Sequence, residues 1–133
     1  MGGTVNDAAA KISQALPKRR RLRARSDFQK VYAEGQRFDG RLLAAFLRRN
    51  DFGEHRLGVT ASIKAVGKST ERNRAKRLLR EMFRTSAKEI ATLKTNYDWV
   101  FNAKRALLDA SQELRVSEFR RIIELVARAE RRD

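Results

Sequence analysis

The sequence predicts an α+β fold: a two-layer sandwich with one four-stranded sheet and helices, in the order α-β-β-β-α-β-α. Segments with apolar residues at helical spacing alternate along the chain with segments whose apolar residues alternate or run together over strand length. The chain has 133 residues, 41% of them hydrophobic, which is enough for one domain with a core. We expect residues 1–15 to form a flexible N-terminal extension and residues 16–133 to form that single domain.

The first predicted helix begins at Ser26 and ends at Gly35. Ser26 and Gln29 have the spacing of a capping box, and glycine is a common residue at the end of a helix. The shared face of this helix consists of Phe28, Val31 and Tyr32.

Two or three strands follow. RLLAAFLRR, residues 41–49, is apolar on both faces and therefore predicts a central strand, and Phe38 indicates a short strand before it. Residues 50–53 form a turn signal, and Arg56 to Lys64 alternate as a half-buried strand does. We expect the strands on either side of this turn to form a hairpin.

A strongly basic helix is predicted for residues 68–84, capped by Ser69 or Thr70. At about 100° per residue its side chains separate into two faces. The apolar face consists of Ala75, Leu78, Leu79, Met82 and Phe83, and the opposite face of Arg72, Asn73, Lys76, Arg77, Arg80 and Arg84. Clustered positive charges repel one another in the free protein, so this face indicates a polyanionic partner.

The remaining predicted elements have weaker sequence patterns. Residues 86–93 are predicted to be helical or nearly so, and Tyr97 to Lys104 to form a strand with Tyr97, Trp99 and Phe101 on one face. A last helix is expected to begin at Ser117, with a frayed charged end over residues 128–133.

The charge favours nucleic acid over a small-molecule substrate. The net charge is +15 and the sequence pI about 11.3, which suits a partner made of phosphates. We expect no membrane partner, because no apolar run approaches about 18 residues, and no signal peptide. The chain has no cysteine, hence no disulfide or thiolate metal site, and we expect it to be cytoplasmic.

Enzyme chemistry is sparse. His55 is the only histidine, and a lone loop histidine is more often a bystander than a general base. Gly67-Lys68-Ser69 resembles the end of a phosphate-binding P-loop, but Ser62 stands where that motif needs its first glycine. We therefore expect no catalytic residue in the protein itself.

The segment RNRAKRLLRE resembles the signature of the protein subunit of bacterial ribonuclease P. The matching positions are Arg72, Asn73, Arg74, Lys76, Arg77, Arg80 and Glu81. LPKRRRLRARSDFQKVYAEG, RLGVTAS and YDWVFNAKR resemble the flanking segments of that family, in the same order. The resemblance covers roughly residues 16–128.

This resemblance implies a left-handed βαβ crossover and a role in removing the 5′ leader from precursor tRNA. It implies that the RNA subunit carries catalysis, binds Mg²⁺ mainly through its own phosphates, and is contacted by the arginine helix. The residues matched to RNA-subunit contact are Arg72, Asn73, Arg74, Lys76, Arg77 and Arg80. Arg74 has the alternative role of a structural ion pair with Glu71 and Glu81.

A second implied site is a cleft that holds the single-stranded leader of precursor tRNA. The matched positions are Phe28, Tyr32, Phe46 and Lys64, and the alternative is that the three aromatic residues belong to the core. The rival functions are a ribosomal or ribosome-assembly protein, a DNA-compacting protein and a free-standing nuclease. A single-strand channel distinguishes the first interpretation from the ribosomal one.

Overall fold

A mixed four-stranded sheet organises the molecule. The computed structural model describes residues 16–132, and its strands have the spatial order β1-β2-β4-β3. The strands are β1 (Gln36–Asp39), β2 (Leu43–Arg49), β3 (Arg56–Thr60) and β4 (Tyr97–Ala103). Strand β4 is antiparallel to β2 and parallel to β3, and β1 is antiparallel to β2. The predicted α+β class is confirmed.

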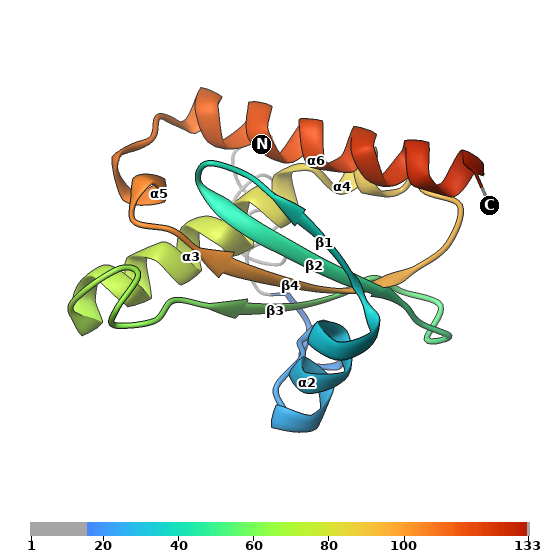
Figure 1. Ribbon diagram of the computed structural model, residues 1–133, viewed down its shortest axis with the longest axis horizontal. Coiled ribbons are helices and arrows are strands. Elements are labelled where there is room, and N and C mark those ends of the chain that lie inside the picture. Colours follow the sequence, from blue (N-terminus) through green and yellow to red (C-terminus); the bar gives the residue numbers. More distant parts are fainter. Residues whose placement is uncertain (1–15, 133) are drawn as a thin grey trace, which may run out of the picture.

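Helices lie on both sides of this sheet, but not equally. They are η1 (Lys18–Arg20, a 3₁₀ turn), α2 (Arg25–Glu34), α3 (Ser69–Thr85), α4 (Ala87–Ile90), α5 (Ala106–Asp109) and α6 (Gln112–Arg132). The long α6 runs along one side of the sheet and the short α2 packs on the other (Figure 1). The predicted extension, residues 1–15, lies outside the described residues.

The main core lies between the sheet and helices α3 and α6. Trp99 and Phe101 of β4 are fully buried there, as is Phe119 of α6. The rings of Phe101 and Phe119 meet edge to face, with their centroids 5.2 Å apart. Since β4 alternates as predicted, its Tyr97, Trp99 and Phe101 side chains all join this aromatic cluster.

The opposite face of the sheet carries a much smaller apolar cluster. Leu22, Val31 and Val100 are buried in it, and Phe28 and Phe46 pack against it half-buried. Because α2 has only ten residues, it covers part of this face and leaves polar side chains of the strands accessible beside it.

The predicted hairpin between residues 41–49 and 56–64 is wrong. Strand β4 lies between β2 and β3, pairing Leu47 with Trp99 on one side and Trp99 with Leu57 on the other. Nearly every residue of β4 is buried, so this strand takes the centre of the sheet, where both faces are covered. The parallel β3 and β4 are joined through α3 and α4; the left-handed sense of this crossover stays a prediction.

The predicted caps of the first two main helices are also wrong. Helix α2 begins at Arg25, so Ser26 lies inside its first turn, and Gly35 ends it as predicted. Helix α3 begins directly after Lys68, whose backbone N–H donates to the Glu71 carboxylate at 3.2 Å. Ser69 and Thr70 are therefore helical residues, because an acidic side chain within the first turn receives the free backbone donor.

Three further boundaries differ from the prediction. Strand β3 ends at Thr60, because Ser62 accepts hydrogen bonds from the next turn through both its carbonyl and its Oγ. Helix α6 begins at Gln112, where the Oγ of Ser111 accepts the N–H of Leu114 at 3.1 Å.

The predicted frayed end is also wrong, because α6 continues to Arg132. Glu130 anchors this end of the helix. This carboxylate is buried, accepts the Lys94 backbone N–H at 2.9 Å and accepts the Tyr97 hydroxyl at 2.6 Å. Burial and this carboxylate together raise the pKa of Tyr97, which keeps the hydroxyl a donor.

Candidate nucleic-acid interface

Helix α3 has the two faces that its sequence predicts. Ala75, Leu78, Leu79, Met82 and Phe83 are buried against the sheet. The side chains of Asn73, Arg74, Arg77 and Arg80 are exposed, and those of Arg72 and Lys76 are half-buried. All six candidate residues for RNA contact therefore lie on one helix, with four of them open to solvent.

The predicted alternative role of Arg74 is not found in the described part of the chain. Glu71, one of its two expected partners, pairs with Arg105 at 2.8 Å and accepts the Lys68 backbone N–H. Glu81, the other, forms no ion pair with Arg74 within residues 16–132. The Lys68 N–H first and Arg105 second lower the pKa of Glu71. This leaves the exposed Arg74 without an ion pair within residues 16–132.

Glu71 and Arg105 also hold the loop before α3. Arg105 donates to the carbonyl of Val66, and Gly67 has a φ of +126°, a conformation that favours glycine. Lys64 lies in this loop with its side chain exposed. The loop is thus fixed at the entry to α3, with Lys64 on its outer side.

The basic residues of segment 18–25, just before α2, extend the positive surface of α3. Arg21 forms a parallel bridge to Leu57 at the outer edge of β3, and the Leu22 N–H donates to the Leu57 carbonyl at 2.9 Å. Partial burial first, and the nearby charge of Arg21 second, lower the pKa of Arg80. The charges of Arg21 and Arg80, which are far apart in the sequence, therefore act on each other. No site was predicted in this segment, although its density of arginine residues indicated an RNA contact.

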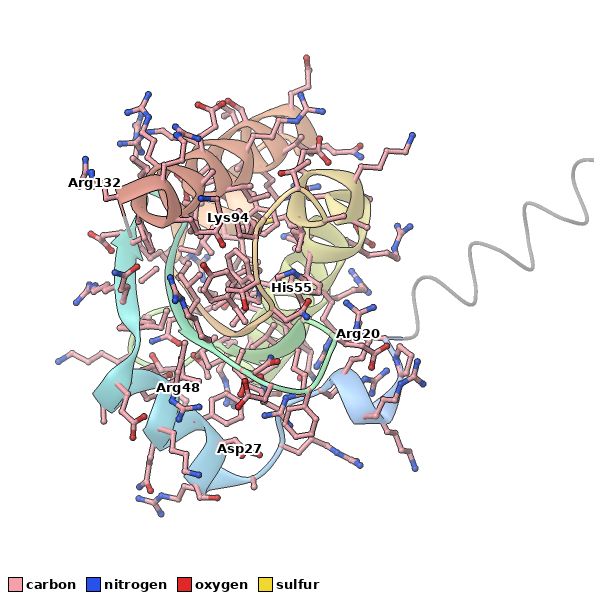
Figure 2. The ribbon with its side chains drawn as sticks, turned by 90° about the vertical axis from the view of Figure 1, so that its right-hand side faces the viewer. Arg20, Asp27, Arg48, His55, Lys94 and Arg132 are labelled. Atoms are coloured by element: carbon pink, nitrogen blue, oxygen red, sulfur yellow. The ribbon has the colours of Figure 1, made fainter. Side chains whose placement is uncertain are left out.

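The histidine is structural. Arg20 donates to the carbonyl of His55 at 2.9 Å, and the two residues lie together where η1 meets the sheet (Figure 2). The Nδ1 atom of His55 accepts the Tyr97 N–H and the Trp99 Nε1–H, each at 3.1 Å. Burial first, and the charge of Arg20 second, lower the pKa of His55 to about 4. This ring is a neutral acceptor inside the core.

On the α2 side of the sheet, the predicted aromatic residues divide into two kinds. Phe28 lies over Gly58 so closely that a Cβ placed there would come 2.5 Å from the tip of its ring. Its half-buried ring, part of the small apolar cluster, fixes α2 to β3. Phe28 therefore packs α2 onto β3 and leaves part of its ring accessible to a ligand.

Tyr32 is the more open aromatic residue, and Phe46, which is half-buried like Phe28, packs against it. Tyr32 is 40% exposed, and its ring meets that of Phe46 edge to face with the centroids 4.9 Å apart. The guanidinium of Arg37 lies 5.5 Å from the centre of the Phe46 ring. The Tyr32 hydroxyl donates to Asn102 Oδ1 at 2.9 Å, which fixes the tyrosine over the sheet.

Asn102 and its neighbour Thr60 were not predicted as site residues. Both lie on the α2 face, paired across β4 and β3, and Thr60 Oγ1 donates to Asn102 Oδ1 at 2.7 Å. A polar asparagine within the apolar run of β4 was the available signal. The structure thus brings Tyr32, Phe46, Asn102 and Thr60 together on one partly open surface, and Lys64 lies beyond the end of β3.

Two kinds of feature are absent from residues 16–132. No group of three or more acidic, histidine or cysteine side chains is placed to hold a metal ion. No helix there combines the length and the apolar character needed to cross a membrane.

Comparison with known proteins decides the family. The family model described as Ribonuclease P matches residues 16–127, which is most of the chain. The chain belongs to the ribonuclease P protein family. It is 39% identical over 92 residues to the ribonuclease P protein component of Clostridium botulinum (strain Langeland), covering 69% of this chain and 80% of that protein.

Solved structures agree with this membership. An RNase P protein from Thermotoga maritima superposes with a TM-score of 0.65 at 27% identity, covering 81% of this chain and 96% of that one. The Staphylococcus aureus RNase P protein gives a TM-score of 0.67 over 80% of this chain and 94% of that one, and at 23% identity it supports the fold. The chain is a subunit of the ribonuclease P endoribonuclease, an RNA-binding protein of tRNA processing.

Proposed function

We propose that this ribonuclease P protein uses two separate surfaces. The exposed face of α3 binds the catalytic RNA subunit, and the surface around Tyr32 and Phe46 binds the single-stranded 5′ leader of precursor tRNA. The observation that carries the proposal is the separation of these surfaces. The apolar cluster under α3 and the one under α2 lie on opposite faces of the sheet, so each surface can engage its own partner.

The α3 surface suits folded RNA. Arginine side chains form paired hydrogen bonds to phosphate, and the Asn73 amide can reach a 2′-hydroxyl. The residues assigned to this contact are Arg72, Asn73, Arg74, Lys76, Arg77 and Arg80. We add Arg21 to them, because it lies at the outer edge of β3 and its charge acts on that of Arg80.

The α2 surface suits unpaired nucleotides. Aromatic rings stack on any base, contributing about 1–3 kcal/mol per base, so leaders of different sequence can bind. Tyr32 offers the most accessible ring, Phe46 supports it edge to face, and Phe28 contributes the exposed part of a ring that is otherwise packed on Gly58. Lys64 is assigned to a phosphate of the leader.

Mg²⁺ is assigned to the RNA partner. The RNA phosphates would hold the ion, which would supply activation of water for hydrolysis of the phosphodiester that joins the leader to the tRNA. The protein residues lower the repulsion between the catalytic RNA and the precursor, and they orient the leader.

The test is reconstitution with a bacterial ribonuclease P RNA. The protein is expected to stimulate leader removal at low Mg²⁺. Absence of both stimulation and specific RNA binding would refute the proposal. If about six phosphates are neutralised, affinity for the RNA subunit should fall roughly 10³-fold between 50 and 200 mM salt.

Substitution of one exposed arginine tests the α3 surface. Arg77→Ala should weaken binding to the RNA subunit. It should also make the slope of log affinity against log salt concentration shallower by about one. Arg128→Ala removes the same charge from an exposed position on α6 and should leave both quantities nearly unchanged. Equal effects of the two variants would show that only net charge matters.

A further inference from the structure

A groove on the α3 side of the sheet lies outside both proposed RNA surfaces. It is found where η1, the end of α3 and α4 meet, and its volume is about 650 Å³. In Figure 2, Arg20 and His55, two polar residues of its lining, lie side by side. Most of the other lining residues are apolar, among them Leu16, Phe83, Ala87, Ile90, Ala91 and Leu93.

Two features of the groove suit a helix as its occupant. Ala87 at the start of α4 and Ala91 just after its end are exposed, and such small side chains let a second helix pack closely. Phe83, Ile90 and Leu93 belong to the main core of the molecule. An apolar side chain that enters the groove therefore extends this core and leaves water.

The chain itself enters the groove at Leu16. This residue is half-buried and packs against the main core. Its carbonyl accepts the Nε–H of Arg21 at 2.6 Å, a bond of the kind that arginine side chains make to the last carbonyls of a helix. Pro17 follows, and a helix usually ends at or before the residue that precedes a proline. Leu16 is thus placed where a helix formed by the preceding residues would end.

The residues before Leu16 have the sequence pattern of an amphipathic helix. Thr4 and Asp7 have the spacing of a capping box. At about 100° per residue, a stripe that extends about 60° to either side of its centre contains all the apolar residues from position 5 onward except Ala10. These residues are Val5, Ala8, Ala9, Ile12, Ala15 and Leu16. The sequence alone favours a flexible extension here, whereas the groove supplies the apolar surface that such a helix needs.

We propose that residues 5–15 dock as a helix in this groove, with Ile12 and the rest of the stripe facing its buried apolar lining. Because Leu16 is already anchored there, docking is intramolecular, and a short tether gives an effective concentration in roughly the millimolar range. A contact that is weak between separate molecules is then sufficient. Docking would hold the N-terminal end of segment 18–25, whose other end is held by the bond of Leu22 to β3.

Engineered disulfides in the full chain test the docking, because the chain has no cysteine of its own. Ile12→Cys is combined with Ala91→Cys, and the control combines Gln14→Cys with Ala91→Cys. Gln14 lies about 160° from Ile12 around a helix but is closer along the chain to the anchored Leu16, so a free tether would favour the control. Under mild oxidation the Ile12 pair should close within one chain faster by about tenfold or more, because docking brings that face to the groove.

A charge introduced into the groove should abolish the effect. Ala87→Glu, at an exposed position, should slow closure of the Ile12 pair to the rate of the Gln14 control, while the circular dichroism of the folded domain is retained.

Amide hydrogen exchange of the wild-type chain gives a readout that needs no cysteine. Residues 8–15, whose N–H groups a helix beginning at residue 5 would bond, should exchange more slowly than an unstructured chain by about tenfold or more, and Ala87→Glu should remove this protection. Equal closure rates for the Ile12 and Gln14 pairs, a disulfide that joins two chains, or unprotected amides in residues 8–15 of the wild type would overturn the inference.

Discussion

Protonation of His55 should destabilise the fold in acid. In the folded chain the pKa of His55 is lowered to about 4 from an ordinary 6.5, first by burial and then by the charge of Arg20. Folding thus favours the neutral ring, and this contribution to stability is complete above pH 6.5 and is lost as the pH falls to 4. A shift of this size corresponds to about 3 kcal/mol of unfolding free energy at most.

The hydrogen bonds of His55 also predict that its protonation destabilises the fold. The Nδ1 lone pair of His55 accepts two N–H groups, from Tyr97 and from Trp99, and a proton on Nδ1 would face both donors. His55→Asn keeps an acceptor at about this place, through its Oδ1, and removes the titrating group.

Urea unfolding of the full chain at pH 7 and pH 4 measures the effect. Carboxylates also titrate in this range, so the informative quantity is the difference between the wild type and His55→Asn. The wild type should lose more unfolding free energy than the variant, by up to about 3 kcal/mol. Equal losses would refute the assignment of His55 as a neutral acceptor in the core.

Two further changes test the packing. Gly58→Ala should cost about 1–3 kcal/mol of unfolding free energy, because its Cβ would meet the Phe28 ring at 2.5 Å; the cost should be smaller in a Phe28→Leu background, and simple additivity would contradict the close contact. Glu130→Ala should cost about 2–4 kcal/mol in thermal or urea unfolding, because it leaves the Lys94 N–H and the Tyr97 hydroxyl without their acceptor. The exposed Glu124→Ala on the same helix should stay within about 0.5 kcal/mol, and similar losses for both would refute the anchoring role of Glu130.

Local patterns predicted most of the elements of this fold. The spacing of apolar residues placed α3 and its buried face, and the alternation of residues 97–104 placed β4 and its aromatic side. The pairing of strands was not predictable in the same way. Nothing local tells that β4 inserts between β2 and β3, because that arrangement depends on which strand buries both faces.

The candidate site was predicted unevenly for the same reason. Arg77 and its neighbours could be placed because a helix determines which side chains share a face. Phe28 could not be separated from Tyr32, since both lie on one face of α2 and only the glycine at position 58 shows which ring is packed down. Asn102 escaped notice because its role depends on hydroxyl groups from α2 and β3, far away in sequence.

The most direct test of the central claim is the ratio of the dissociation constants for precursor and mature tRNA, measured on the reconstituted ribonucleoprotein. Tyr32→Ala should reduce the preference for the precursor by an amount corresponding to about 1–3 kcal/mol, the value of one stacked base. Arg77→Ala should weaken assembly with the RNA subunit but leave that preference unchanged in the assembled particle. A preference that survives Tyr32→Ala in full, or that Arg77→Ala removes after assembly, would contradict the two-surface account.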